Sequence, residues 1–534
     1  MYDKFSLMHK KEIYLLSFLF VWFVIFASSF IAPNTLDSWN LINNVLRFET
    51  FSSYFDTTGV GFSMEMLLYI FSIPFGVGIG FIILSLLFFF LFCFLVFNIS
   101  FLYKRNITNS YLILILSIPV SIPQIGGFYW DHAGLYLGVL LLYLVHNQTK
   151  DFRLRNIFFI SIVCSIMFFS KQNSGLIYFI GIFCAALVSG KRISYKDFGL
   201  IILLTISLGS LIHLFSFNNL NILETTYFHI KTMFLYVQDN PLDKGRLDLN
   251  LDLFLLKLFP AFNKHYYTNF YPLASPYIFL ISLINFFIIF QSIKSLIEKN
   301  RSDLFLYIGL IALHYSSVLL WGRNWTYTQS LLPLIFYLSI DKELSIKNIL
   351  PIILISLIFC FIFFRGIFYS YSENTPSPLK PLMYSYEAKK QMEYNLASKI
   401  NFNNLQEYIS HMAPDCIFTI GTSANPLMSF GKEVCTNRVQ IDQSRAVLRE
   451  SFESSTKSFL SSVNNSKNIM TIDSCFREES ICREKNDLVF YENLVRVYSS
   501  NLANEKALEG FKIYHNIKKK EKYNLPQDIK TFEK

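Results

Sequence analysis

The sequence predicts a polytopic α-helical membrane protein with a smaller extracytoplasmic α/β domain at its C-terminal end. Of its 534 residues, 53% are hydrophobic and 57 are phenylalanine. The mean hydropathy is +0.38, a value that soluble domains seldom reach. About eleven apolar stretches qualify as membrane spans, and the composition turns polar after residue 366. A membrane class is therefore favoured for residues 1–366, followed by a soluble domain over 367–517 and a charged tail over 518–534.

Each apolar stretch is interpreted as a helix that crosses the bilayer. We expect these spans at 13–31, 77–99, 110–127, 131–146, 157–170, 174–189, 198–217, 277–293, 304–321, 327–340 and 349–366. The third with the fourth, and the fifth with the sixth, could instead each form a re-entrant pair. The first stretch is interpreted as a retained span because its apolar run continues past the small residues 27–29, where a signal peptide could be cleaved.

Lysine and arginine residues in the short loops predict the orientation, since such residues collect on the cytoplasmic side. They occur before the first span and then in alternate loops, at Lys104, Arg105, Lys150, Arg153, Arg155, Lys191, Arg192, Lys196, Lys294, Lys299, Arg301, Lys342 and Lys347. The opposite side then receives the loops 32–76 and 219–276 and the whole C-terminal part. The net charge of +9 is spread over these loops, so no nucleic-acid partner is expected.

The eight cysteines form two groups, four in the apolar spans and four in the polar C-terminal part. Cys93, Cys164, Cys184 and Cys360 lie within apolar spans and are expected to be small buried side chains. Cys416, Cys435, Cys475 and Cys482 lie in the polar part, which the orientation places in an oxidising compartment. Disulfides are expected there, and proximity in sequence favours Cys416 with Cys435 and Cys475 with Cys482. A zinc site is the alternative, although the spacings are not of the CxxC kind.

Short apolar runs in the polar part predict strands, and amphipathic runs predict helices. The expected strands are 415–420, 468–472, 494–498 and 511–515, and the expected helical segments are 386–409 and 443–462. This alternation is typical of a small α/β domain.

The outer loop 32–76 holds two acidic residues close to the membrane. Asp37 follows the first span by a few residues, and Asp56 precedes Gly59 and an amphipathic stretch over 62–73. Asp37 could simply cap a helix over 38–48, and Asp56 could lie in an Asx turn. The loop is nevertheless the first candidate for an active site, because ionisable groups kept at a membrane boundary are commonly functional.

Other polar residues on the same side interrupt the apolar stretches. Asp131 and His132 begin the fourth span, Lys171 lies alone between two apolar runs, and Arg323 and Tyr327 precede or begin the tenth. Asp131 could be a helix cap, and the cations could be interfacial residues that extend toward water. Their common side, which is the side where cations are not expected, favours a function.

In the order of these features the chain resembles the polytopic GT-C glycosyltransferases that use a polyprenyl-phosphate sugar, such as the protein O-mannosyltransferases and the lipid A aminoarabinose transferase. The resemblance covers about residues 13–366. It lies in an acid after the first span (Asp37), an aromatic-x-Asp element (residues 54–56), an Asp at the start of a span (Asp131), Ser-Lys followed by Gly (Ser170, Lys171, Gly175), and Arg and Tyr before Leu-Leu-Pro-Leu (residues 331–334). The chain departs from the family in having Ser38 where many members have Glu, and Gly59-Val60-Gly61 in place of a proline-rich element.

The resemblance implies an inverting transfer of sugar from a polyprenyl phosphate to a hydroxyl of a cell-surface glycan, lipid or protein, at the outer face of a bacterial cytoplasmic membrane. Asp37 would be the general base and Asp56 would orient hydroxyl groups. Lys171 and Arg323 would hold the donor phosphate, while Asp131, His132 and Tyr327 would contact substrate. No nucleotide cofactor is expected, since no Walker or Rossmann motif occurs. A divalent metal between the acids stays open.

Two other functions remain. An O-antigen polymerase or ligase would use the loop 219–276, with Arg246 and His265, more than Asp37. A transporter or flippase of lipid-linked sugars would instead carry its charges near the middle of broken helices.

Overall fold

The computed structural model describes chiefly the helices and strands. The described ranges are 62–104, 106–126, 130–147, 154–170, 172–190, 193–217, 301–321, 329–339, 402–420, 468–473, 504–508 and 511–515, with residues 17–21, 41–42, 45, 286–287, 289–290, 293, 297, 350 and 353–354. Their contacts divide the chain into two compact units. The first comprises 1–32, 82–212 and 245–384, and the second comprises 33–81, 213–244 and 385–534.

The helices of the first unit follow the predicted spans closely. They are α3 (Phe62–Lys104, shared with the second unit), α4 (Ile107–Gly126), α5 (Trp130–His146), α6 (Leu154–Ser170), α7 (Gln172–Val188), α8 (Tyr195–Phe217), α12 (Arg301–Trp321), the 3₁₀ turn η5 (Gln329–Leu331) and α14 (Leu332–Leu338). The third and fourth spans are separate helices, as are the fifth and sixth. A re-entrant pair also consists of two helices, so that alternative is not tested. The described positions in the first, eighth and eleventh spans are also helical. The total of eleven spans stays a prediction.

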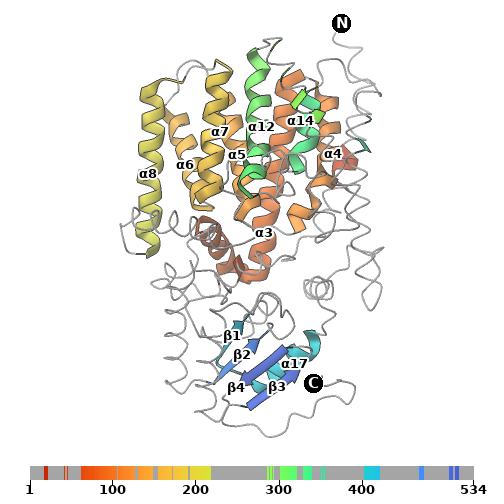
Figure 1. Cartoon of the computed structure of the whole chain (residues 1–534), viewed down its shortest axis with the longest axis vertical. Coiled ribbons are helices and arrows are strands. Elements are labelled where there is room, and N and C mark those ends of the chain that lie inside the picture. The colour runs from red at the N-terminus through yellow and green to blue at the C-terminus, as the bar shows by residue number, and fades with distance from the viewer. Residues whose placement is uncertain are drawn as a thin grey trace. The chain divides into compact units, whose positions relative to one another are not determined.

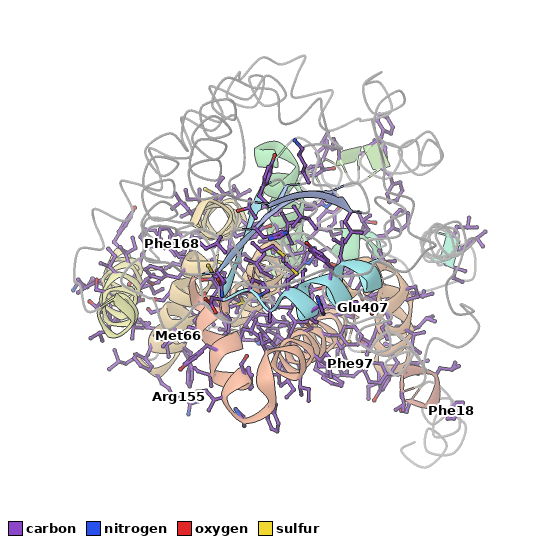
Figure 2. All side chains as sticks on the ribbon, turned by 90° about the horizontal axis from the view of Figure 1, so that it is seen from below. Phe18, Met66, Phe97, Arg155, Phe168 and Glu407 are labelled. Atoms are coloured by element: carbon purple, nitrogen blue, oxygen red, sulfur yellow. The ribbon has the colours of Figure 1, made fainter. Side chains whose placement is uncertain are left out.

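One of the described helices, Ser63–Tyr103 in α3, is long and apolar enough to cross a membrane by itself. Shorter apolar helices run over Ile107–Ser121, His132–His146, Leu154–Ser170, Gly175–Val188 and Leu304–Tyr315. Arg155 lies exposed near the start of α6, at the end predicted to be cytoplasmic (Figure 2). The described helices agree in position with the predicted spans, and a polytopic membrane protein stays the prediction of the sequence.

A core of three helices holds the first unit together. α5, α7 and α12 pack against one another, with α6 against α5 and α7, and with α14 and η5 against α4 and α12 (Figure 1). Two serine hydroxyls tie α6 to α8: Ser161 Oγ donates to the Ile201 carbonyl at 3.3 Å, and Ser165 Oγ donates to the Thr205 carbonyl at 2.9 Å. Inside a membrane the hydrophobic effect does not drive helices together, because the lipid is as apolar as the bundle. Hydrogen bonds between helices therefore contribute to their association.

Burial corrects one expectation about the cysteines. Cys93 and Cys164 are buried and free, as predicted, but Cys184 is exposed. Its position on α7 faces away from the bundle, so the prediction of burial is wrong there. An apolar helix position is equally compatible with bundle and lipid, and sequence alone does not separate the two. Cys360 lies outside the described residues.

The described strands of the second unit form a four-stranded sheet with the order β1-β2-β4-β3. β1 (Cys416–Ile420) pairs in parallel with β2 (Ile469–Asp473), and β4 (Phe511–His515) pairs antiparallel with β2 and with β3 (Asn504–Leu508). β1, β2 and β4 confirm the strands predicted at 415–420, 468–472 and 511–515. β3 was not predicted, because its sequence NEKAL is largely polar. Among the described strands it pairs with β4 alone, and an edge position tolerates such residues. The predicted strand 494–498 lies outside the described residues.

Helix α17 (Phe402–Met412) covers part of the segment predicted to be helical at 386–409. Leu405, Tyr408, Ile409 and Met412 are buried and recur at the spacing of one helix face. The Tyr408 ring lies 6.4 Å from that of His515 on β4, so this face packs toward the sheet. The extent 367–517 of a separate domain and its extracytoplasmic location stay predictions, and the helical segment 443–462 lies outside the described residues.

Cys416 is disulfide-bonded and fully buried at the first position of β1. Its partner lies outside the described residues, so the pairing with Cys435 stays a prediction. Replacing Cys416 with serine should lower the free energy of unfolding of the C-terminal part by about 2–5 kcal/mol, because the unfolded chain regains the freedom that the bond removes. Thermal unfolding of the full chain under non-reducing conditions measures this. Cys184→Ser, at a free and exposed position, is the matched control, and equal unfolding temperatures for the two variants would contradict the prediction.

Candidate active site

Close contacts at two glycines show the relative direction of α5 and α12 and which of their residues are level with each other. A Cβ built on Gly138 of α5 would lie 2.9 Å from Leu313 Cδ2 of α12, and one built on Gly309 would meet the Leu142 side chain. The rings of His146 and Phe305 stack with centroids 6.0 Å apart. Residue numbers rise along one helix as they fall along the other, so the two helices are antiparallel. Eight residues lead back from Gly138 to Trp130, and eight lead on from Leu313 to Trp321, so the start of α5 is level with the end of α12.

Helix α7 is also antiparallel to α12, and its first residue is level with the last residue of α12. A Cβ on Gly181 would lie 3.3 Å from Ala312 Cβ, and nine residues separate Gly181 from Gln172 just as nine separate Ala312 from Trp321. The Tyr178 ring lies beside both Gly134 and Gly138 of α5. The first residues of α5 and α7 and the last residue of α12 therefore lie at one level, at the same end of the three-helix core.

This alignment brings together three of the segments that carry predicted site residues. Asp131 and His132 lie in the first turn of α5, Lys171 directly precedes α7, and Arg323 follows the end of α12 by two residues. His132 is 4% exposed. Because α5 begins at Trp130, Asp131 lies within the first turn, where the partial positive charge of the helix end favours a carboxylate. The side chain of Asp131 and all atoms of Lys171 and Arg323 lie outside the described residues.

The remaining predicted site residues are not placed. Asp37, Asp56 and Tyr327 lie outside the described residues, as does the loop 219–276 with Arg246 and His265. Leu41, Ile42 and Val45 are described as helical and buried. Their spacing agrees with the helix expected over 38–48, at whose start Asp37 would lie.

The α6–α7 turn explains the glycine that follows Lys171. A Cβ on Gly175 would lie 2.8 Å from both the Met167 carbonyl oxygen and Phe168 Cα. Both are backbone atoms, which cannot move aside as a flexible side chain would. Gly175 therefore permits the close approach of α6 and α7 directly beside Lys171.

Glu65 is an acidic residue that the sequence reasoning missed. It lies in the first turn of α3, in the second unit, and is fully buried. Met64 and Leu68 on the same helix are also fully buried. The signal was present in the sequence, since Glu65 is the one charged residue in the apolar run 62–75, and a carboxylate kept in such a run is a functional candidate.

Two histidines lie within the predicted spans, and the structure describes the side chain of one of them. His314 of α12 is fully buried, with its ring centroid 5.1 Å from that of Tyr315. His213 belongs to α8, and its side chain lies outside the described residues. Among the described residues no group of three His, Cys, Asp or Glu side chains is close enough to hold a metal ion.

Comparison with solved structures finds ArnT from Cupriavidus metallidurans, in the apo state and bound to undecaprenyl phosphate. The apo structure is 10% identical, with a TM-score of 0.49, over 94% of this chain and 98% of that chain. The undecaprenyl phosphate complex is 11% identical, with a TM-score of 0.49, over 95% of this chain and 98% of that chain. No protein-family model and no curated protein matches the sequence.

ArnT is a GT-C lipid A aminoarabinose transferase, one of the two kinds of enzyme that the sequence resembles. At this sequence identity and TM-score, the likeness says nothing about the reaction or the substrates of this protein. The reaction of this protein has to be inferred from its own residues.

Proposed function

We propose that the protein is a membrane glycosyltransferase that transfers a sugar from a polyprenyl phosphate to an acceptor hydroxyl. The observation that carries the proposal is the common level of the starts of α5 and α7 and the end of α12. The adjoining residues include two cations, Lys171 and Arg323, on the membrane side where cations are not expected. Two cations at a membrane edge suit the phosphate of a lipid whose tail remains in the bilayer.

The proposed reaction forms a bond between the acceptor oxygen and the anomeric carbon, and breaks the bond from that carbon to the phosphate oxygen. Asp37 removes the proton of the acceptor hydroxyl, a contribution typically worth about 10²–10⁴-fold. Lys171 and Arg323 stabilise the charge that gathers on the departing phosphate, Arg323 through paired hydrogen bonds. The products are the glycosylated acceptor and the polyprenyl phosphate, with inversion at the anomeric carbon.

The remaining candidates have supporting roles in this proposal. Asp56 orients acceptor or sugar hydroxyl groups. Asp131, His132 and Tyr327 contact the donor, and the burial of His132 at the start of α5 suits a substrate-facing position.

Incorporation of label from a polyprenyl-phosphate sugar into purified envelope fractions tests the proposal. The full-length protein in lipid vesicles should transfer label from a polyprenyl-phosphate sugar to the acceptor. A lipid-diphosphate sugar should not act as donor. Transfer that depends on Arg246 and His265 but not on Asp37 would favour the polymerase or ligase class. Movement of the lipid-linked sugar across the membrane without transfer would favour a transporter. Glycan profiling of a strain that lacks the protein would then identify the sugar and its acceptor.

Replacing Gly175 with alanine should reduce the transfer rate, because the new Cβ would meet the α6 backbone and displace the turn that carries Lys171. A displacement of about 1 Å at reacting groups can cost about 10²-fold. The initial rate of label transfer at saturating donor measures the effect. Gly199→Ala on α8 is the matched control, since a Cβ there meets nothing within 4 Å. A wild-type rate in Gly175→Ala would show that the tight turn is not needed for transfer.

A further inference from the structure

Helices α6 and α8 lie side by side in a constant register (Figure 1). Each contacting residue of α8 lies 40 positions after its partner on α6, in three successive pairs: Ser161 with Ile201, Ser165 with Thr205, and Phe169 with Gly209. Residue numbers rise together along the two helices, so the helices are parallel. The partners recur at every fourth residue and therefore share one face of each helix. The three pairs lead along α6 toward its last residue, Ser170.

The third pair is a contact between an aromatic ring and a glycine. The side chain of Phe169 is 6% exposed, and Gly209 is buried. A Cβ built on Gly209 would overlap Phe169 Cε2 and would lie 3.0 Å from Cζ and 3.5 Å from Cδ2. Rotation of the ring by half a turn would present an equivalent edge to the new atom. The ring can therefore keep its position only while residue 209 has no side chain.

Phe169 is the residue before the last in α6, and Lys171 directly follows the end of that helix. On the other side of Lys171, α7 begins, and its Gly175 meets the backbone of Met167 and Phe168. Lys171 therefore lies in the sequence between two close contacts, one with α8 and one between α6 and α7. Helix α8 carries none of the predicted site residues, and its contact with Phe169 gives it a role at the end of α6.

We propose that the ring of Phe169, held against Gly209, positions Lys171 for the donor phosphate. This role rests on the proposed function and adds to it a positioning residue that does not itself contact the substrate. A group that stabilises developing charge acts only from the correct distance, and a displacement of about 1 Å at reacting groups can cost about 10²-fold in rate. Fixing the end of α6 against α8 therefore affects the reaction through Lys171.

Gly209→Ala should slow transfer, because the ring has to move away from the new methyl group. To reach an ordinary carbon–carbon contact of about 3.5 Å, the ring would move by about 1 Å. The rate at saturating donor should then fall by about 10- to 10²-fold, measured as label transfer per amount of folded, membrane-inserted protein in lipid vesicles. Gly199→Ala, also on α8 but with nothing within 4 Å of its Cβ, is the matched control and should keep the wild-type rate. A wild-type rate in Gly209→Ala would overturn the proposal.

The Lys171→Ala background separates a positioning role from a general contribution to stability. Substitutions that act through the same group are not additive, so Gly209→Ala should cost little further rate once Lys171 has been replaced. If the contact only holds α6 to α8, Gly209→Ala should slow transfer by the same factor in both backgrounds. Equal factors would therefore contradict the proposed role of Phe169.

A substitution of the ring tests the same contact even if Gly209→Ala alone does not fold. Leucine lacks the Cε and Cζ atoms that would meet the new Cβ, so Phe169→Leu makes room for a methyl group at residue 209. Phe169→Leu alone should slow transfer several-fold, because it leaves a gap beside Gly209. Adding Gly209→Ala fills part of that gap and should recover part of the rate, whereas adding Gly199→Ala should not. Failure of the Phe169→Leu, Gly209→Ala double variant to recover any rate would also overturn the proposal.

Failure of this proposal and failure of the proposed function are seen in different proteins. If the wild-type protein transfers no sugar from a polyprenyl phosphate, the proposed function is wrong, and Lys171 has no donor phosphate to hold. If the wild-type protein transfers sugar and the Phe169 and Gly209 variants do so at the same rate, the glycosyltransferase function stands and the positioning role alone is wrong.

Discussion

Asp37→Asn should abolish sugar transfer while the protein still inserts and accumulates in the membrane. Removing a general base from a hydroxyl attack lowers the rate by about 10²–10⁴-fold. Asparagine is almost isosteric with aspartate and is an equally good helix N-cap. If Asp37 served only to cap the helix over 38–48, the variant would therefore keep its activity. Label transfer from a polyprenyl-phosphate sugar, at equal amounts of membrane-inserted protein, distinguishes the two roles.

Asp197→Asn provides the matched control for this substitution. Asp197 lies in the first turn of α8, at the end predicted to be cytoplasmic, so the same chemical change there should leave transfer intact. Near-normal transfer in Asp37→Asn would remove Asp37 from the role of base. Asp56, and also Glu65, would then be the next acids to replace.

Lys171→Ala and Arg323→Ala should each reduce transfer by about 10²–10³-fold, the usual loss when one group that stabilises developing charge is removed. Both cations would face the phosphate as it gains charge, so the effect should fall on the rate at saturating donor as well as on donor affinity. Arg323→Lys keeps the charge but loses the paired hydrogen bonds, and it should recover part of the activity. Steady-state rates over a range of donor concentrations measure both quantities.

Arg155→Ala is the control for the two cations. Arg155 is an exposed cation near the start of α6, at the opposite end of that helix from Lys171. Its removal should leave donor affinity unchanged. If Lys171→Ala and Arg323→Ala behaved like Arg155→Ala, the cations would be interfacial residues without a part in the reaction.

Several element boundaries could be predicted from local chemistry. The spans expected to end at 146, 170, 217 and 321 end there in α5, α6, α8 and α12, since the apolar runs are bounded by charged or polar residues. The break at Gly76 coincides with the predicted start of the second span at residue 77. The strands Cys416–Ile420 and Phe511–His515 were likewise recognisable as apolar runs. In each case the information lies within a few neighbouring residues.

The candidate site could be predicted only in part. The sequence predicts Asp131, Lys171 and Arg323 on one side of the membrane, because lysine and arginine residues collect in alternate loops on the other, cytoplasmic side. It did not reveal that their helix ends are level, which depends on where Gly138, Gly181 and Gly309 meet their neighbours. Side chains far apart in the sequence decide that alignment, and a single sequence contains no record of such contacts.

By itself, then, the sequence predicted most of the described helices, the side of the membrane that each loop is expected to occupy, and the residue types that could bind a lipid phosphate. Only the tertiary structure decided which face of each helix is turned inward. Glu65 proved to be buried and Cys184 exposed. The sequence marks Glu65 as an isolated charge in an apolar run, but the burial or exposure of these two side chains could not be read from the pattern. The physical reason is that lipid and bundle interior are similarly apolar, so the apolar periodicity that marks the inner face of a helix in a soluble protein is weak here.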